Sequence, residues 1–365
     1  MSRFYIIMII FFAMITVKGQ SPFSLSEIQG LKEYMEFHCQ FEDFNNDGIP
    51  DLFICGQTQS SGGCAIQTEI YYFSPPYSFS PSGITLPAVQ NGSSILWDYD
   101  MDGDGDIIYS GMDDENNPQL YIMNNENNQY SQFSHSIPAL SFCKFDLTDM
   151  NQDGNYEILY GGINTLKSIS FYLIEWNGHS FSYEELELPQ LFPYSHAFFD
   201  INLDGLGDVF FTGKSIQGQN TNQIYINSIQ NGLEQDNRFS NPSLNISSLS
   251  PFDMDGDGDW DLIFSGKNNK NTPLSGIFLN QPTGFLDFHY KELSQLTGHT
   301  VTADFNGNGF PDIFNWGLQS DYSSQSVFLQ NLGNIEFQSF PIYLNLYQGF
   351  CSKGDFNLDS KPDII

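Results

Sequence analysis

Positive charge is scarce in this chain. There are 12 Lys and Arg residues against 44 Asp and Glu residues, and the formal net charge is −32. Binding to nucleic acid requires clustered cations that contact phosphates, so this composition excludes nucleic acids as natural partners. A strongly acidic chain can be disordered, but here 40% of the residues are hydrophobic and 16% are aromatic. The chain can therefore bury a core, and its acidity must serve another purpose.

Long apolar runs are also lacking after the N-terminal stretch, and a membrane span takes about 20 such residues. Arg3 precedes a shorter apolar run that ends at Val17, and Gly19 offers a small residue for cleavage. These features are typical of a secretory signal peptide, with an uncleaved anchor as the alternative. We predict that residues 1–19 are a signal peptide and that residues 20–365 are a secreted, extracellular or lumenal chain without a transmembrane span.

Catalytic signatures are missing. The six histidines show no HExxH spacing, and there is no Gly-x-Ser-x-Gly elbow. A polysaccharide lyase needs cations for the uronate carboxylate, yet Arg238 is the only arginine after the N-terminal stretch. We therefore expect a non-enzymatic protein, with a glycan-active lyase or hydrolase as the least favoured alternative.

Cysteines are few, and five in a secreted chain leave at least one unpaired thiol. Cys39 and Cys351 both lie four residues before an acidic loop, so a bridge between them would join the two ends of the chain. Cys55 and Cys64 flank one turn and could also pair, which would leave Cys143 free. Buried free thiols are common, so both pairings stay open at this point.

What the sequence does contain is an internal repeat, the feature that identifies repeat architectures. The pattern Asp-x-(Asp/Asn)-x-(Asp/Asn)-Gly-x-x-(Asp/Glu) returns seven times, with the seventh copy lacking the glycine. Successive copies start 55, 51, 51, 53, 51 and 51 residues apart. Their first residues are Asp43, Asp98, Asp149, Asp200, Asp253, Asp304 and Asp355.

Short apolar segments accompany each loop. One follows the last acid directly and ends in glycine, as in residues 106–111 and 208–213, and another comes some twenty residues after the loop start, as in residues 120–123 and 224–227. These β-branched and aromatic runs, bounded by Gly, Asn and Ser, predict strands. Four strands per repeat of about 51 residues is typical of a propeller blade. We predict an all-β, seven-bladed β-propeller.

The unit resembles the FG-GAP repeat, also called the VCBS repeat, of integrin α-chain propellers. The resemblance rests on the acidic loop, on the following strand that ends in glycine, and on the later Leu-Tyr-(Ile/Leu)-x-Asn strand, and it covers essentially the whole mature chain. It implies blades around an axis, with calcium held in the turn between the first and second strands. It does not identify a ligand, because function depends on loops grafted onto the fold.

The chemistry of the loop supports the same metal. Calcium takes six to eight oxygen ligands; residues 1, 3, 5 and 9 of each loop can supply side-chain oxygens, residue 7 a backbone carbonyl, and Gly at residue 6 permits a positive φ. Up to seven calcium sites are predicted, the seventh being the weakest match. Their candidate ligands are Asp43, Asn45, Asp47, Asp51, Asp98, Asp100, Asp102, Asp106, Asp149, Asn151, Asp153, Glu157, Asp200, Asn202, Asp204, Asp208, Asp253, Asp255, Asp257, Asp261, Asp304, Asn306, Asn308, Asp312, Asp355, Asn357, Asp359 and Asp363.

Two other interpretations of these loops are weaker. An EF-hand needs a Glu at residue 12 and flanking helices, but residue 12 here lies in an apolar strand and is Ile54, Tyr109, Tyr160, Phe211, Phe264 or Asn315. Simple solvation of the carboxylates is the other alternative, and it leaves several like charges in one tight loop without a cation.

The last blade is predicted to be incomplete. The third strand of a repeat begins more than twenty residues after the loop starts, whereas the chain ends ten residues after Asp355. We expect residues 23–31 to join this blade beside residues 363–365. That leaves either a three-stranded blade or a natural chain that continues past Ile365.

The remaining expectations concern recognition. Asn91 and Asn245 begin N-glycosylation sequons. The chain is expected to be a cell-surface or matrix adhesion module that binds an extracellular protein or glycan, and the alternative is a calcium-dependent lectin. We place the partner on the face opposite the calcium loops, where connections such as residues 214–223 lie.

Overall fold

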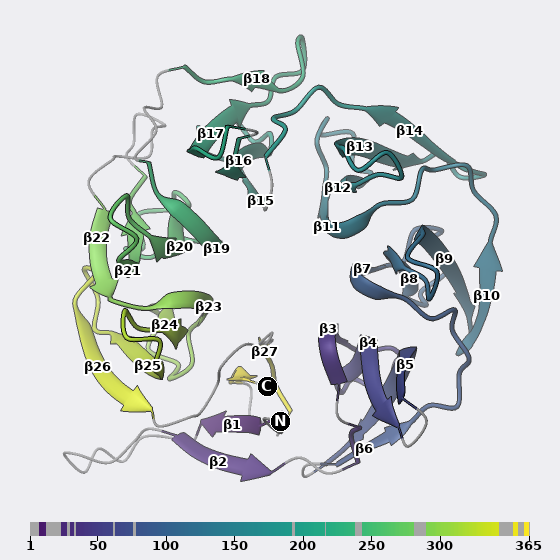
Figure 1. Ribbon diagram of the computed structural model, residues 1–365, viewed down its shortest axis with the longest axis horizontal. Helices are drawn as coiled ribbons and strands as arrows, with labels where there is room; N and C mark the ends of the chain where they lie inside the picture. Colours follow the sequence, from purple (N-terminus) through teal and green to yellow (C-terminus); the bar gives the residue numbers. More distant parts are fainter. Residues whose placement is uncertain are drawn as a thin grey trace.

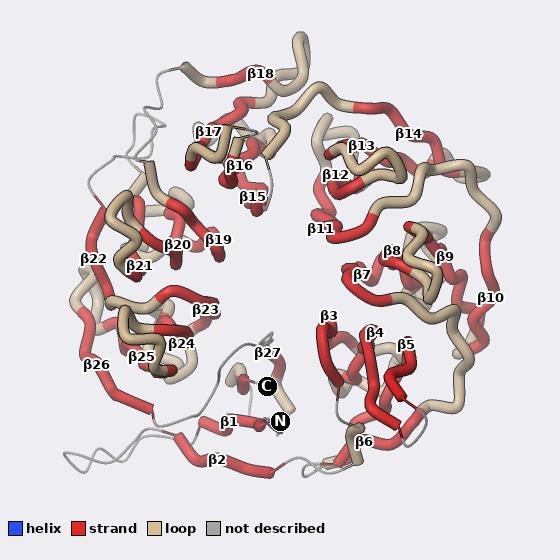
Figure 2. Tube along the Cα trace, viewed as in Figure 1, coloured by secondary structure: helices blue, strands red, loops and turns tan. Residues whose placement is uncertain are grey.

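The computed structural model describes residues 7–11, 23–27, 30–32, 34–60, 63–75, 78–191, 194–215, 217–237, 243–280, 290–342, 353–356 and 361–364. Each regular element in these ranges is a β-strand, and the sheets stand around a central axis (Figure 1, Figure 2). The predicted all-β propeller is confirmed. A search of these same ranges finds no helix with the length and apolar character that a membrane span requires.

Six blades are each built from four consecutive antiparallel strands. Blades one to three contain β3 (Tyr34–Glu42), β4 (Asp51–Ser60), β5 (Gly63–Ser74), β6 (Ser78–Pro81), β7 (Gln90–Trp97), β8 (Asp106–Met112), β9 (Pro118–Glu126), β10 (Gln129–Phe133), β11 (Ser141–Thr148), β12 (Glu157–Ile163), β13 (Ile169–Trp176) and β14 (Phe181–Glu185). Blades four to six contain β15 (Tyr194–Phe199), β16 (Asp208–Lys214), β17 (Asn220–Ile226), β18 (Glu234–Gln235), β19 (Asn245–Phe252), β20 (Asp261–Lys267), β21 (Pro273–Phe278), β22 (Tyr290–Ser294), β23 (Thr297–Ala303), β24 (Asp312–Leu318), β25 (Ser324–Asn331) and β26 (Phe337–Ile342).

The count of seven such blades is corrected to six, because the two chain ends form a composite sheet, here called the closing sheet. It contains β1 (Ile7–Phe11), β2 (Phe23–Glu27), β27 (Lys353–Gly354) and β28 (Asp363–Ile364) in the order β2-β1-β28-β27. Figure 1 shows β1, β2 and β27 in the sector of the ring between β26 and β6. The closing sheet thus lies between blades six and one.

The predicted composition of this sheet was wrong in one respect. Residues 23–27 do enter it, but they pair with β1, and β1 rather than β2 lies beside β28, through the pair Ile9 and Ile364. The extra strand comes from a segment that was assigned to the signal peptide, because an apolar β-branched run satisfies both patterns equally well. The sheet therefore has four strands instead of three.

The second strand of each blade is the most buried element. In β8, β12, β16, β20 and β24 the first six residues are all buried, because each strand is covered on both faces by neighbouring blades. This explains why the sequence there is continuously apolar rather than alternating. The outer strands β10 and β14 are mostly exposed. The strands predicted from the apolar runs are confirmed.

The core consists of separate clusters in the seams between sheets rather than one central mass. One cluster joins blades one and two through Phe53 and Tyr109, and another joins blades five and six through Ile277 and Val327. The closing sheet contributes Phe356 to the cluster of blade one and Ile364 to that of blade six. The ring is therefore held by apolar packing across every seam, including the two on either side of the chain ends.

Strand direction separates the two faces of the ring. The acidic loops all connect the first strand of a blade to its second, so they share one face of the ring. Connections between second and third strands, such as the one from β24 to β25, lie on the opposite face together with the links from one blade to the next. The first strands, including β7, β11 and β19, lie closest to the axis (Figure 1).

Candidate metal loops

The acidic loops share one backbone conformation. Their sixth residue has a φ between 84° and 98° in Gly48, Gly103, Gly154, Gly205, Gly258 and Gly309, which confirms the expected role of that glycine. Their fourth residue is also left-handed, with φ between 58° and 79° in Asn46, Met101, Gln152, Leu203, Gly256 and Gly307. This second feature was not predicted from the sequence, because the residues at that position have no common property.

The first aspartate of each loop accepts hydrogen bonds from the loop's own backbone. In the fourth loop, Asp204 N donates to Asp200 Oδ1 at 3.2 Å and Gly205 N donates to Asp200 Oδ2 at 2.8 Å. The same two bonds form at Asp43, Asp98, Asp149 and Asp304. The loop is therefore wrapped around this carboxylate, which holds the other acidic side chains close to it.

The last acid of each loop connects the loop to the third strand of its blade. Ile201 N donates to Asp208 Oδ2 at 2.9 Å, and Asn227 N donates to Asp208 Oδ1 at 2.7 Å. Asp106 and Asp261 repeat both bonds. In the third loop the longer Glu157 accepts from Met150 N at 2.7 Å. Sequence reasoning identified this acid as a ligand but not as a structural connection.

Burial of this acid changes its protonation. The side chains are almost completely inaccessible, and desolvation disfavours the charged carboxylate. It raises the pKa to about 7 in Asp51, Asp106, Glu157, Asp208, Asp261 and Asp312. The neighbouring acids of each loop raise it further, against the lowering effect of the backbone hydrogen bonds. A cation in the loop would favour the ionised carboxylate and so lower the pKa of this acid.

Three loops bring three carboxylates together within 4.8 Å of one another: Asp98, Asp100 and Asp106; Asp149, Asp153 and Glu157; and Asp253, Asp255 and Asp261. In the second and fifth loops the remaining predicted acid instead accepts a backbone bond, from Asp104 N to Asp102 Oδ1 at 2.9 Å and from Asp259 N to Asp257 Oδ1 at 3.1 Å. The sixth loop has Asn306 and Asn308 in two ligand positions, so its oxygen set carries less charge.

The donor chemistry of the loops fits a hard divalent cation. Carboxylate and amide oxygens are the ligands that calcium takes. Two buried oxygens, Asp51 Oδ2 and Asp259 Oδ1, have no hydrogen-bond partner among the described residues, and buried oxygens are normally paired. Asp259 was not among the predicted side-chain ligands. It is the seventh residue of its loop and the fifth carboxylate there, and burial raises its pKa to about 6.

The second residue of each loop, missed by sequence reasoning, is a buried contact point for the next blade. Asn227 Nδ2 of blade four donates to Met150 O of blade three at 2.8 Å. The same bond joins Asn280 Nδ2 to Ile201 O at 2.8 Å, and Asn331 Nδ2 to Met254 O at 3.0 Å. The sequence did contain a signal for this contact: the second residue of the acidic loop is apolar or aromatic in every copy, although the residues on either side of it are polar.

Aromatic rings make the equivalent contact where the asparagine is absent. Trp176 of blade three packs edge-on against Tyr99 in the loop of blade two, with ring centroids 4.6 Å apart. Phe73 of blade one meets Phe356 of the closing sheet at 5.4 Å. Each of these loops is therefore part of a seam as well as a candidate metal site.

The seventh loop is described only in part. Phe356 N donates to Asp363 Oδ2 at 3.0 Å, which repeats the connection made by the last acid elsewhere. Asn357 and Asp359 lie outside the described residues, so the seventh site stays a prediction. Cys351 lies outside them too, but Cys39 is a free thiol, so the predicted Cys39–Cys351 bridge is not formed.

The Cys55–Cys64 bridge is not present, and both residues are free thiols. Cys55 pairs with Thr68 across the hairpin, whereas Cys64 pairs with Gln59. Four residue positions of extended strand, at about 3.3 Å each, separate the two, which exceeds the roughly 7 Å Cα limit for a disulfide. Cys55 and Cys64 flank one turn in the sequence, but they do not face each other across the hairpin.

The two glycosylation sequons are near the starts of the inner strands β7 and β19, where the side chains of Asn91 and Asn245 are half-buried. Asn91 has a φ of 51°, and a register shift between Gln90 and Ser93 interrupts the pairing of β7 with β8. Occupancy of both sequons stays a prediction.

Comparison with known families agrees with this geometry in the central part of the chain. Residues 200–264, which span the fourth acidic loop and the first strands of blade five, match the model of the FG-GAP-like repeat. This chain contains an FG-GAP-like repeat. The matched segment has the acidic loop, the following strand that ends in glycine and the later Ile-Tyr-Ile-Asn strand, so the FG-GAP resemblance is confirmed.

Among proteins of known sequence, the chain is similar to the T-cell immunomodulatory proteins of rat and mouse. It is 23% identical to the rat protein over 329 residues and 24% identical to the mouse protein over 328 residues, and each match covers 79% of this chain and 51% of the relative. The chain thus spans about half the length of these curated relatives.

Among solved structures, similar chains include a lectin of Aleuria aurantia described as a six-bladed β-propeller with a fucose recognition mode, with 9% identity and a TM-score of 0.47 over 88% of this chain and all of that one. AofleA of Arthrobotrys oligospora is 11% identical, with a TM-score of 0.47 over 87% of this chain and 92% of that one.

Proposed function

We propose that this FG-GAP-containing chain is a calcium-binding β-propeller that acts as a non-enzymatic recognition or adhesion module outside the cell. The observation that supports calcium is the convergence of three carboxylates within 4.8 Å in each of three loops on one face. Such a set is electrostatically unfavourable without a cation, since like charges repel at these distances. Bound calcium would neutralise it without moving the backbone that already surrounds it.

The metal would stabilise the ring rather than take part in a reaction. Each loop contacts the next blade through its second residue, so a cation that rigidifies a loop also holds a seam. At a free calcium concentration about tenfold above the Kd, each site adds about 1.4 kcal/mol of stability by linkage. Several such sites make a substantial share of the roughly 5–15 kcal/mol that a typical domain possesses.

Recognition is proposed because the fold offers loops on a rigid ring, the arrangement on which binding surfaces are commonly built. The net charge of −32 disfavours anionic partners such as nucleic acid. The proposed partner is an extracellular protein or glycan, and secretion directed by residues 1–19 is part of this proposal; the closing sheet requires that β1 (Ile7–Phe11) stays attached to the chain.

Calcium binding is tested by isothermal titration of the chelator-treated protein, followed by thermal melts in calcium and in EGTA. We expect a melting temperature lower by many degrees in EGTA. Asp255→Asn, in a three-carboxylate cluster, should reduce the calcium-dependent shift, whereas Asp114→Asn, in an exposed turn outside the loops, should not. Equal melting temperatures in calcium and EGTA would refute the proposal.

A calcium-dependent lectin is the second candidate. It is favoured by a cavity in the seam between blades five and six that has no charged side chain in its lining, within the described part of the chain.

A further inference from the structure

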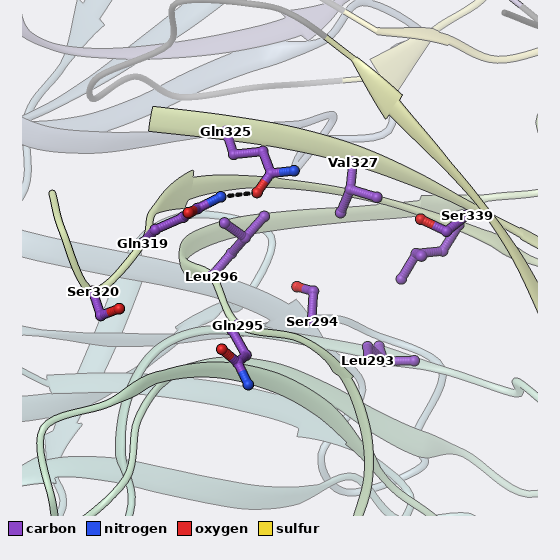
Figure 3. Close-up of a pocket in the computed structure, with 10 residues that line it drawn as sticks. Leu293, Ser294, Gln295, Leu296, Gln319, Ser320, Gln325, Val327 and Ser339 are labelled. Atoms are coloured by element: carbon purple, nitrogen blue, oxygen red, sulfur yellow. Dashed lines mark hydrogen bonds between the residues drawn. The ribbon is translucent and has the colours of Figure 1, made fainter. Parts of the chain in front are cut away.

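A cavity of about 320 Å³ lies in the seam between blades five and six (Figure 3). Its walls come from the end of β22, the link to β23, the turn after β24, and the strands β25 and β26. It therefore lies toward the face opposite the acidic loops, on the side where the sequence analysis places the partner. The lining residues are Leu293, Ser294, Gln295, Leu296, Gln319, Ser320, Gln325, Val327, Leu329 and Ser339.

Blade six differs from blades two to five at one residue of the repeat, and that residue pairs with a lining residue of the cavity. The twelfth residue after each loop start is a fully buried aromatic ring in blades two to five: Tyr109, Tyr160, Phe211 and Phe264. Each ring packs into the seam with the preceding blade. The two tyrosines also bond the link before their own blade, Tyr109 Oη to Pro87 O at 3.0 Å and Leu140 N to Tyr160 Oη at 2.7 Å. In blade six this residue is Asn315, whose side chain is shorter than these rings.

Asn315 is buried with an unsatisfied amide. Its side chain is inaccessible to solvent, and neither Nδ2 nor Oδ1 has a hydrogen-bond partner among the described residues. Asn315 pairs with Val327 across β24 and β25. Directly opposed residues of an antiparallel pair lie on the same face of the sheet, so Asn315 lies on the face that Val327 presents to the cavity. A buried amide with no partner is rare in proteins and calls for a hydrogen-bonding ligand or water.

The chemistry of the lining restricts the ligand. Six of the ten residues carry amides or hydroxyls and the other four are aliphatic, so no charged side chain lines this cavity within the described part of the chain. In a protein of net charge −32, an uncharged site favours a neutral ligand. Gln319 Nε2 donates to Gln325 Oε1 at the rim (Figure 3). The buried Leu296, Val327 and Leu329 offer an apolar surface beside these amides.

We propose that this cavity binds one neutral sugar residue, with the lining residues Gln319 and Gln325 supplying hydrogen bonds to its hydroxyls and with Asn315 placed beside the lining residue Val327. Hydroxyl groups both donate and accept, as amides do, and the C–H face of a pyranose ring matches the aliphatic wall. The volume is at the small end of ligand sites, which suits a single terminal residue rather than an extended chain. This inference rests on the recognition function proposed above and names its ligand class.

The test is saturation-transfer NMR and calorimetry on the full chain in calcium. The probes are methyl glycosides of neutral hexoses, deoxyhexoses and N-acetylhexosamines, with a methyl hexuronide and a hexosamine as charged comparisons. We expect at least one neutral glycoside to bind more tightly than both charged probes. Asn315→Phe, which restores the ring found in blades four and five, should abolish binding while raising the melting temperature. Gln325→Ala should weaken binding by about fivefold.

Gln119→Ala is the matched control, because Gln119 Nε2 bonds Asp113 Oδ2 at 2.8 Å across the equivalent turn of blade two, away from the cavity. It should leave binding unchanged. The proposal is overturned if no neutral glycoside binds at about 50 mM, if the hexuronide binds best, or if Gln325→Ala and Gln119→Ala bind alike. Failure of the sugar site with a normal calcium-dependent melting shift would leave the calcium proposal standing, whereas loss of that shift would refute calcium separately.

Discussion

Asn227 Nδ2 donates a hydrogen bond to Met150 O at 2.8 Å, and the two residues are 77 positions apart in the chain. Both are buried. Met150 is the second residue of one acidic loop, and Asn227 follows the third strand of the next blade. Asp208 is the last acid of the loop in blade four, and it accepts a hydrogen bond from the backbone N of the same Asn227 at 2.7 Å. One asparagine therefore links two loops in neighbouring blades.

Loss of this bond should destabilise the ring measurably. Asn227→Leu leaves Met150 O buried without its partner, and an unsatisfied buried polar group costs about 1–3 kcal/mol. We expect the urea unfolding free energy in calcium to fall by that amount. Asn231→Leu, in the exposed turn that follows, should change it by less than about 0.5 kcal/mol. Equal effects of the two substitutions would show that the link is energetically unimportant.

The buried acids predict an unusual pH dependence in EGTA. Burial raises the pKa of Asp208 from 3.8 to about 7 in the folded chain, so between these values the folded state binds more protons than the unfolded state. The free energy of unfolding should therefore fall as the pH rises from 5 to 7.5. Six acids share this shift, so the effect should be large in a pH series of thermal melts.

Calcium should suppress that fall, because the cation favours the ionised carboxylates that burial disfavours. Asp208→Asn should reduce the pH slope in EGTA, and Asp114→Asn serves as the control for a simple loss of negative charge. A melting temperature in EGTA that rises between pH 5 and 7.5 would contradict the assignment of these shifts.

Thiol reactivity should distinguish the cysteines. Cys64 is exposed and free, whereas Cys39, Cys55 and Cys143 lie among the blades, and burial raises the pKa of Cys39 and Cys143 to about 12. We expect a maleimide to label Cys64 in the native protein and the other three only after unfolding, as measured by peptide mass spectrometry. Protection of Cys64 that is lost on reduction would instead indicate a disulfide.

The closing sheet makes the ring sensitive to its N-terminal strand. Deletion of residues 23–27 removes the partner of β1 along five consecutive residue pairs and opens an unpaired edge, which favours association. We expect a lower melting temperature together with a larger hydrodynamic size in light scattering. Deletion of the turn residues 268–271 in blade five, replaced by Asn-Gly, is the control. An unchanged melting temperature in the first deletion would show that the closing sheet is dispensable.

The acidic loops and the strands around them could be derived from the sequence because their causes are local. A glycine at the sixth position, oxygens on alternate residues and an apolar run after the last acid all act within about fifteen neighbouring residues. Repetition then averages out accidental matches. The all-β propeller follows from the same unit, since a four-stranded blade buries its second strand only when it stands between two others.

The contacts between blades could not be derived in this way. Asn227 and Met150 belong to different repeats, so their pairing depends on how the sheets stack rather than on any spacing within one repeat. The strand β1 of the closing sheet was missed for a related reason: residues 7–11 have the same apolar pattern as a signal sequence, and only the position of the C-terminal strand beside them gives that segment a partner.

The environment of Asn315 could not be predicted from the sequence and depends on the tertiary structure. Its place in the repeat, where other blades have an aromatic residue, is visible in the amino-acid order. That order does not reveal whether the shorter side chain is solvated, bonded or enclosed, because burial is set by the facing blade. Packing of blade five against blade six buries Asn315 next to Val327, a lining residue of the cavity, and this spatial fact, rather than the residue type, makes Asn315 the residue to test.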